Sequence, residues 1–292
     1  VRHFVAFESF EAWWYQYLEN SAGNLATSSD GFYTVVNNIN GELYLFGKNS
    51  SIPVWVYDFE SNVVSSLAIS ANGEYIAVGC SNGGAYLFTK SSNSPLWEME
   101  ACTGSGTSTH SISISDDGRY IAAGGNYEVR FFDSNTNTEI WSHSPGGDLQ
   151  SIDISADGEY IVVGSNNAEV SFYDKDFTNN EPLWSYDTGN TVSTVSISAS
   201  GEYAVAGSDD DHVYLFDKNS GTPIWSYDTH TNVYSVDISD NGNSIIGASQ
   251  TDVYLFSKDS DTPIWEYEID NPFSASISGN GEYIIVGSNE DK

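Results

Sequence analysis

The chain is poor in positive charge. It contains 9 lysine and arginine residues against 41 aspartate and glutamate residues, which gives a formal net charge of −32 at pH 7. Nucleic-acid phosphates and anionic membrane surfaces are bound mainly through lysine and arginine. The composition therefore argues against both as partners and favours cations or basic patches on other proteins.

Long apolar runs, helical periodicity and cysteine are also scarce. No run approaches the roughly 18 apolar residues of a membrane-spanning helix. The two cysteines, Cys80 and Cys102, exclude a disulfide scaffold. They follow the second and fourth predicted strands of one repeat, so a direct gap would be about 10 Å. The longer loop 101–109 could close that gap, so a disulfide between them stays open.

Short runs of β-branched and aromatic residues are abundant. The stretch 191–232 contains four of them, at residues 192–197, 202–206, 212–216 and 223–227. Clusters of Gly, Asp, Asn and Ser separate the runs, which is typical of strands joined by tight turns. Four strands in about 42 residues is the period of a β-propeller blade.

This unit recurs along the whole chain. The glycine of the first turn returns at positions 31, 73, 118, 158, 201, 242 and 281. The third strand returns at 43–46, 85–88, 129–132, 170–173, 213–216 and 253–256. The fourth strand carries Trp55, Trp97, Trp141, Trp184, Trp225 and Trp265. Seven first turns against six third and fourth strands leave the last unit half built.

The N-terminal residues match the missing half. Residues 1–4 resemble 129–132, and nine residues separate Phe4 from Trp13, as nine separate Phe216 from Trp225. We therefore predict an all-β, seven-bladed propeller of four-stranded antiparallel blades, with residues 1–292 as one domain. Residues 272–292 plus 1–20 would form the last blade, so that two strands from each end close the ring and remove its open edge.

Two families of propeller repeats are similar to this chain. Residues 235–239 (Ser-Val-Asp-Ile-Ser) and 213–217 (Val-Tyr-Leu-Phe-Asp) resemble the first and third strands of a WD repeat, with Phe in place of the signature Trp. Residues 220–225 (Ser-Gly-Thr-Pro-Ile-Trp) resemble the tryptophan-docking segment of quinoprotein-like repeats. The Gly-His pair of WD repeats and the Cys-Cys pair of quinoprotein alcohol dehydrogenases are both missing. The resemblance thus implies architecture, and function must be argued from sites.

The tryptophans are predicted to be structural. One Trp per blade at a fixed position is what packing of an outer strand on the next blade requires. This role is assigned to Trp13, Trp55, Trp97, Trp141, Trp184, Trp225 and Trp265. Trp14 alternates to the other face of its strand, so we expect it to be an exposed contact residue.

The charges are predicted to separate between the two faces of the ring. Loops between second and third strands and between blades form one face, called the acidic face here; the opposite face is called the lysine face. Five lysines follow third strands, on the lysine face: Lys48, Lys90, Lys175, Lys218 and Lys258. The acidic face carries Asp148 and the binding candidates Asp209, Asp210, Asp211, Asp252, Asp270, Glu290 and Asp291.

No catalytic constellation is apparent. The histidines lack zinc-site spacing, no Ser lies in a nucleophile elbow, and 209–211 lacks the ligand series of a calcium loop. We therefore expect a non-enzymatic binding or scaffold module, extracellular or on a cell surface, with no cofactor beyond a weakly bound divalent cation. Its acidic face would bind a basic protein surface. The alternatives are a quinoprotein-like oxidoreductase with a quinone cofactor and a cytoplasmic WD-repeat-like hub.

Overall fold

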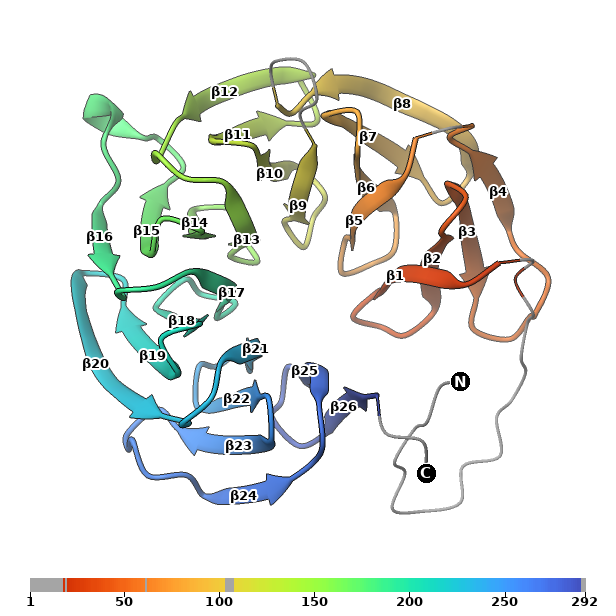
Figure 1. The fold of residues 1–292 in the computed structure, drawn as a ribbon. Coiled ribbons are helices and arrows are strands. Elements are labelled where there is room, and N and C mark those ends of the chain that lie inside the picture. The colour runs from red at the N-terminus through yellow and green to blue at the C-terminus, as the bar shows by residue number, and fades with distance from the viewer. Residues whose placement is uncertain (1–17, 19, 61, 103–107, 290–292) are drawn as a thin grey trace. The chain divides into compact units, whose positions relative to one another are not determined.

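The computed structural model describes residues 18, 20–60, 62–102 and 108–289 (Figure 1). Within these residues the regular structure consists of 26 strands and one 3₁₀ turn, η1 (Thr178–Asn180). The strands form six four-stranded sheets and one two-stranded sheet. The predicted all-β class and four-strand repeat are confirmed. The chain divides into two compact units, here called the N-terminal unit, which ends at Leu149, and the C-terminal unit, which begins at Gln150.

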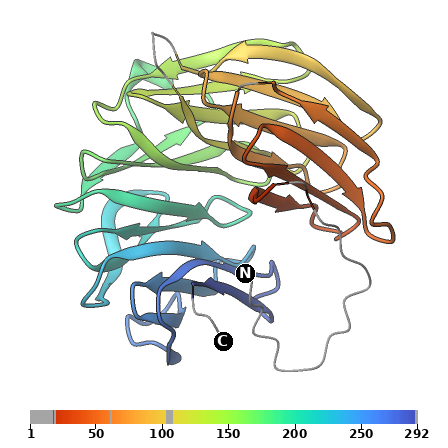
Figure 2. The ribbon, with the colours of Figure 1, turned by 45° about the vertical axis from the view of Figure 1, so that its right-hand side comes forward.

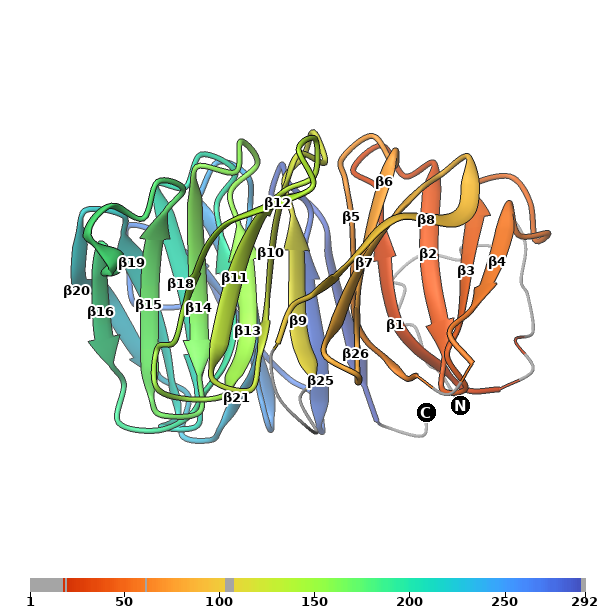
Figure 3. The ribbon, with the colours of Figure 1, turned by 90° about the horizontal axis from the view of Figure 1, so that it is seen from above.

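The N-terminal unit contains three sheets. The first sheet consists of β1 (Ala22–Thr27), β2 (Tyr33–Asn38), β3 (Glu42–Gly47) and β4 (Trp55–Asp58). The second consists of β5 (Val64–Ile69), β6 (Tyr75–Cys80), β7 (Gly84–Thr89) and β8 (Ser92–Glu100). The third consists of β9 (Thr109–Ile114), β10 (Tyr120–Gly125), β11 (Glu128–Asp133) and β12 (Thr138–His143). Figure 3 shows neighbouring strands of these sheets side by side.

The C-terminal unit contains three four-stranded sheets and one two-stranded sheet. The first consists of β13 (Leu149–Ile154), β14 (Tyr160–Ser165), β15 (Glu169–Asp174) and β16 (Trp184–Asp187). The second consists of β17 (Val192–Ile197), β18 (Tyr203–Ser208), β19 (His212–Asp217) and β20 (Ser220–Asp228). The third consists of β21 (Val233–Ile238), β22 (Ser244–Ser249), β23 (Asp252–Ser257) and β24 (Trp265–Glu268). The last pair is β25 (Pro272–Ile277) and β26 (Ile284–Ser288).

A buried serine explains the recurring first turn. Ser198, at the end of β17, accepts a hydrogen bond at Oγ from the backbone N–H of Tyr203, which starts β18, at 3.1 Å. Gly201 lies between them with φ 70°, a left-handed conformation that favours glycine. The same bond joins Ser70 to Tyr75 and Ser155 to Tyr160, at 3.0 Å in each case. A short polar side chain that satisfies a turn N–H is the physical reason for the repeated Ser-x-x-Gly-x-Tyr pattern.

Sheets pack face to face inside each unit, and the core lies between them. In the C-terminal unit, one buried cluster takes Phe172 from β15 and Phe216 from β19. The inner strands approach closely, because a Cβ added to Gly207 would lie 2.5 Å from a methyl group of Val233. Figure 2 shows successive sheets of this unit, cyan to blue, one below the other. Small residues on inner strands therefore allow the sheets to converge there.

Polar clamps join the inner strands of neighbouring sheets. The Oγ of Ser151 on β13 accepts a hydrogen bond from the Val195 N–H on β17, at 3.1 Å. The Oγ of Ser235 on β21 does the same for Ala275 on β25, at 3.0 Å. Hydrogen bonds of this kind fix the offset between sheets, which apolar contacts alone leave free.

The predicted inner strands of the last blade are present. The sequence placed two strands of the last blade within residues 272–292, and β25 and β26 lie in this range. Within the described residues this sheet has two strands. The predicted outer strands within residues 1–17 lie outside the described residues.

Candidate functional site

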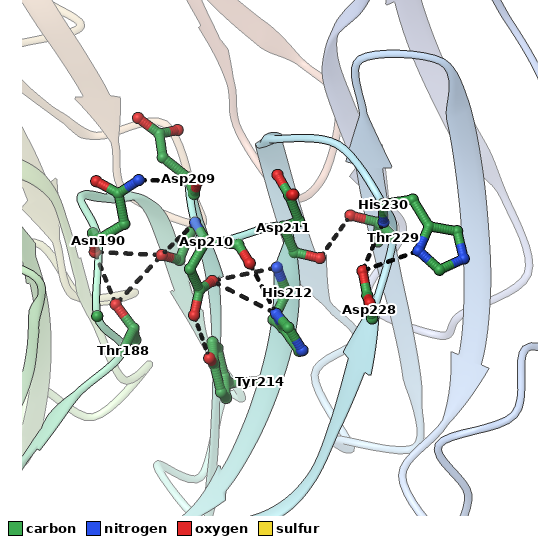
Figure 4. A network of polar contacts seen from close by, with 12 residues as sticks. Thr188, Asn190, Asp209, Asp210, Asp211, His212, Tyr214, Asp228, Thr229 and His230 are labelled. Carbon is green, nitrogen blue, oxygen red and sulfur yellow. Dashed lines mark hydrogen bonds and ion pairs between the residues drawn. The ribbon is translucent and has the colours of Figure 1, made fainter.

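The three consecutive aspartates of the acidic face lie in the hairpin between β18 and β19 (Figure 4). Asp211, the last of them, has φ 72°. Aspartate tolerates this left-handed conformation better than most residues because its short side chain bonds locally. The hairpin therefore presents three carboxylates on one tight turn.

The middle carboxylate is held by its own hairpin. Asp210 accepts a hydrogen bond from the backbone N–H of His212 at 3.2 Å, and the Tyr214 hydroxyl donates to its other oxygen. Burial and this bond to Asp210 both raise the pKa of Tyr214, so the phenol stays protonated as a donor. Asp210 thus orients the turn, and its carboxylate is less available to a partner than the sequence suggested.

The two flanking carboxylates are more available. The Asp209 carboxylate accepts a hydrogen bond from Ser193 Oγ at 3.0 Å, and the Asp209 backbone carbonyl accepts one from Asn190 Nδ2 at 3.0 Å. Asp211 is anchored through its backbone carbonyl, which accepts from the N–H and Oγ1 of Thr229 at 2.8 Å and 2.9 Å. In the part of the chain that the structure describes, no hydrogen-bond donor reaches the Asp211 carboxylate. Both residues are half-buried on this turn.

Two histidines adjoin this hairpin. His212 lies opposite Asp228 in the β19–β20 pairing, and its Nδ1 lies 2.9 Å from the carbonyl oxygen of Asp210. His230 Nδ1 lies 3.1 Å from Asp228 Oδ1. The His230 N–H and the nearby imidazoles lower the pKa of Asp228 and keep it ionised. His212, Asp228 and His230 were not among the predicted site residues.

His230 occupies a turn position that recurs in the repeat. Residues 228–230 (Asp-Thr-His) correspond to 187–189 (Asp-Thr-Gly) in the preceding sheet. Gly189 has φ 94° and His230 has φ 64°, so both occupy the same left-handed turn position. Glu60 holds the equivalent position of the first sheet with φ 59°, so the repeat also accepts residues other than glycine there.

The remaining acidic candidates spread over other connections. Asp252, at the start of β23, accepts a hydrogen bond from Thr251 Oγ1 at 2.5 Å. Asp270 is exposed in the connection from β24 to β25. Glu290, Asp291 and Trp14 lie outside the described residues. The structure therefore brings Asp209, Asp210 and Asp211 together and leaves Asp252 and Asp270 on separate loops of the same unit.

The lysines at the opposite ends of the sheets form ion pairs within the protein. Lys90 and Lys218 pair with the glutamates of their own first turns, Glu74 at 3.0 Å and Glu202 at 2.6 Å, and Lys175 pairs with Glu159. Lys90 and Lys218 also lie over tyrosine rings of the preceding sheet, with 5.3 Å and 5.1 Å to the ring centroids. Their positive charge is therefore largely neutralised on the lysine face.

The predicted structural tryptophans occupy different environments. Trp55, Trp97, Trp141 and Trp225 are buried, and Trp184 is half-buried. Trp265 on β24 is 37% exposed, whereas Trp13 lies outside the described residues. The Nε1 of Trp97 has no hydrogen-bond partner within the described residues. We have no physical account of that unpaired donor.

Cys80 and Cys102 are both buried, and the structure does not join them by a disulfide. Burial raises the pKa of Cys80 to about 12 and that of Cys102 to about 11, so neither thiol ionises near neutral pH.

Across the described residues, no three His, Cys, Asp or Glu side chains are grouped closely enough to hold a metal ion. No described helix has the length and apolar character needed to cross a membrane.

Repeated four-stranded antiparallel sheets with small inner and aromatic outer residues define a β-propeller repeat protein. A family model described as outer membrane protein assembly factor BamB, which is built from PQQ-like repeats, matches residues 125–278. This match covers more than half of the chain, and the chain belongs to this family. A model described as WD domain, G-beta repeat, matches residues 52–89. No curated protein matches the chain. The predicted likeness to both repeat families is thus confirmed.

Proposed function

We propose that this chain is a protein-interaction β-propeller that binds a basic partner through its acidic face and catalyses no reaction. WD and PQQ-like repeats support an interaction module in general terms. The observation that carries the specific proposal is the separation of charge. Lys218 and Lys90 are paired on the lysine face.

The acidic face lacks such neutralisation in the described residues of the C-terminal unit. No lysine or arginine of the described chain forms an ion pair with Asp209, Asp210, Asp211 or Asp252. Among the described residues, the basic side chain paired with this hairpin is His212, whose Nδ1 lies 3.8 Å from Asp210 Oδ1. Carboxylates gathered on one rim produce a negative potential that attracts a basic surface and accelerates its encounter. A weakly bound divalent cation is the remaining ligand that this potential favours.

An extracellular or cell-surface location is part of the proposal. The large excess of acidic over basic residues and the Ser- and Asn-rich turns support it. The family description names an outer-membrane assembly factor, which is a property of that protein. For this chain we propose only the shared feature, a propeller that binds other proteins outside the cytoplasm.

We further propose that the chain is a single seven-bladed domain, closed by residues 1–17 on the β25–β26 sheet. Apolar side chains are exposed where the outer strands would lie: Trp265 is 37% exposed, Tyr267 55% and Ile285 67%. In the alignment of the repeats, Ala6 occupies the position of Lys218, whose carbonyl accepts the hydrogen bond of Trp184. The Ala6 carbonyl would accept the corresponding bond from Trp265.

A second recurring contact supports closure. In each unit, the tyrosine that starts a second strand packs on the first-turn glycine of the following sheet. A Cβ on Gly242 would lie 2.5 Å from the Tyr203 ring, and one on Gly73 would lie 2.6 Å from the Tyr33 ring. Tyr283 is 70% exposed, and among the described residues nothing lies within 4 Å of a Cβ on Gly31. We propose that closure of the ring covers the exposed Tyr283 ring.

Charge neutralisation tests the binding proposal. Asp209, Asp211, Asp252 and Asp270 are changed together to Asn; Asp210 is kept because it holds the hairpin. The matched control changes four exposed acids on the lysine face of the same unit: Asp240, Asp259, Asp261 and Glu282 to their amides. Each variant loses its four negative charges, so the change in net charge is the same. The probe is a fluorescent octa-lysine peptide, followed by anisotropy at low and high ionic strength.

The acidic-face variant should bind the peptide about tenfold more weakly at low salt, which corresponds to ~1.4 kcal/mol. Its affinity should also depend less on salt, because fewer screened charges remain. The control should retain wild-type affinity. Equal weakening of both variants would show that net charge alone acts and that no face is preferred.

A further inference from the structure

An open pocket of about 510 Å³ lies at the edge of the third sheet of the N-terminal unit. Asn126, Tyr127 and Glu128 line it from the hairpin between β10 and β11, and Ser142, His143 and Ser144 line it from the end of β12. The register explains this grouping, because Val129 pairs with His143 and Arg130 with Ser142. The volume falls within the range of about 300–1,000 Å³ that is usual for small-molecule sites.

Tyr127 occupies a backbone conformation that disfavours it. Its φ is 66°. The corresponding hairpin positions hold Gly41 with φ 92° and Gly83 with φ 79° in the two preceding sheets, and the small residues Ala168 with φ 73° and Asp211 with φ 72° in the two following sheets, so Tyr127 is the bulkiest residue of the five. Left-handed φ is rare for a bulky residue, which pays a conformational cost there. Backbone strain of this kind is retained where a side chain serves a function or gains compensating contacts.

Compensating contacts for the Tyr127 side chain are lacking within the described residues. The side chain is 56% exposed. Its backbone carbonyl accepts a hydrogen bond from Ser144 Oγ at 2.6 Å, which fixes the position of the residue. In the described chain neither its ring nor its hydroxyl bonds to another side chain. Packing in the folded protein therefore does not account for tyrosine at this position.

The other lining groups are polar and held in place. Glu128 is paired with Arg130 at 3.0 Å, and Arg130 also pairs with Glu139 at 3.0 Å. Arg130 is largely buried and shares its one positive charge between Glu128 and Glu139, so the Glu128 carboxylate is oriented and partly compensated. Ser142, His143 and Asn126 add side chains that can donate or accept hydrogen bonds. The lining thus combines one exposed aromatic ring with donors and acceptors of little net charge.

We propose that this pocket binds a carbohydrate unit. A pyranose has an apolar face of C–H groups and a rim of hydroxyls, each of which both donates and accepts. The Tyr127 ring covers the apolar face, since an aromatic ring offers a large rigid apolar surface at low entropic cost. Glu128, Ser142 and His143 bond the hydroxyls. A cationic ligand fits less well because Glu128 already has a cationic partner. The pocket lies among loops of the acidic face and uses none of the carboxylates assigned to the basic partner.

Saturation-transfer NMR with four separate methyl glycosides tests the proposal: those of glucose, galactose, mannose and N-acetylglucosamine. The variants are Tyr127→Gly, which removes the ring and relieves the backbone, and Tyr127→Phe, which keeps the ring. Ala168→Gly is the matched control, because it relieves the same left-handed position, φ 73°, in the hairpin between β14 and β15 and has no assigned binding role. Both glycine variants should raise the melting temperature by about 1–4 °C.

At least one glycoside should give a transfer signal with the wild type, with Tyr127→Phe and with Ala168→Gly. Tyr127→Gly should lose that signal although it is at least as stable as the wild type. The proposal is overturned if no glycoside gives a signal with the wild type, or if the signal survives in Tyr127→Gly. Octa-lysine binding that depends on Tyr127 in the absence of glycoside binding would overturn it in favour of a cation–π site.

Discussion

Trp184 donates a hydrogen bond from Nε1 to the backbone carbonyl of Lys218, on the neighbouring sheet, at 2.9 Å. The Lys218 ammonium lies 5.1 Å from the Tyr160 ring centroid and pairs with Glu202 at 2.6 Å. One residue therefore joins two sheets through its backbone and its side chain. Trp55 and Trp225 make the same bond to Lys90 at 3.2 Å and to Lys258 at 3.0 Å.

Removing a buried tryptophan should be costly. Trp225 is 8% exposed and packs against Phe256 with ring centroids 5.2 Å apart. Trp225→Ala should lower the free energy of unfolding by roughly 3–5 kcal/mol, the usual range for losing a buried aromatic. Trp225→Phe keeps most of the apolar contact and should cost less. Urea denaturation measures both, and a loss below about 1 kcal/mol for Trp225→Ala would contradict a structural role.

The lysine side chains should matter far less. Glu202 is 46% exposed in its pair with Lys218, and exposed ion pairs contribute about 0–1 kcal/mol. Lys218→Met keeps the backbone carbonyl that accepts the Trp184 bond and keeps the apolar stem. We expect a loss of at most ~1 kcal/mol in the free energy of unfolding, decreasing with added salt. A loss as large as that of Trp225→Ala would show that the side chain, rather than the carbonyl, joins the sheets.

Asp237 should make stability depend on acidic pH. Desolvation raises its pKa above 3.8, although hydrogen bonds from the Ile277 N–H and the Ser276 hydroxyl act in the opposite direction. Because the folded pKa exceeds the unfolded one, the folded chain binds more protons between the two values. The free energy of unfolding should therefore fall as pH rises through that window.

Carboxyl NMR during a pH titration checks this directly. Ser276→Ala removes one bond that stabilises the charged carboxylate, at 2.7 Å, so it should raise the pKa of Asp237 further. An Asp237 resonance that titrates at or below 3.8 in the wild type would contradict the expected direction.

Both cysteines should be unreactive thiols in the folded protein. Cys80 is 0% exposed and Cys102 is 1% exposed, and burial raises both thiol pKa values. A thiol reagent at neutral pH should label neither in the folded chain and both after denaturation without reductant. Absence of labelling in the denatured chain would instead reveal the disulfide that the sequence left open.

Local sequence patterns were enough to predict most strands and turns of the fold. The strand predicted at 192–197 coincides with β17, and the glycine turns recur with Gly201 as expected. This worked because strand alternation and turn conformation depend on neighbouring residues. The environment of Asp210 depends instead on Tyr214, four residues along the next strand, so sequence alone could not show that its carboxylate is engaged.

The site residues that the sequence did not predict depend on the three-dimensional structure. His212, Asp228 and His230 meet because a hairpin and the following connection lie side by side, and no spacing rule describes that meeting. Tyr127 was overlooked because its importance lies in a backbone angle. Only comparison with Gly41 and Gly83 in equivalent turns makes it visible.

The proposed binding through the acidic face depends on the proposed closure by the N-terminal segment. Only a complete propeller would give the acidic loops a common face. The most direct measurement is a thermodynamic cycle between Trp265→Ala and deletion of residues 1–17, followed by urea denaturation. Trp265 is 37% exposed in the described structure, and closure would bury it. Trp265→Ala should then cost about 3–5 kcal/mol in the full chain and under ~1 kcal/mol in the truncated chain. Equal costs in both chains would show that residues 1–17 do not cover Trp265, and the closed propeller would be wrong.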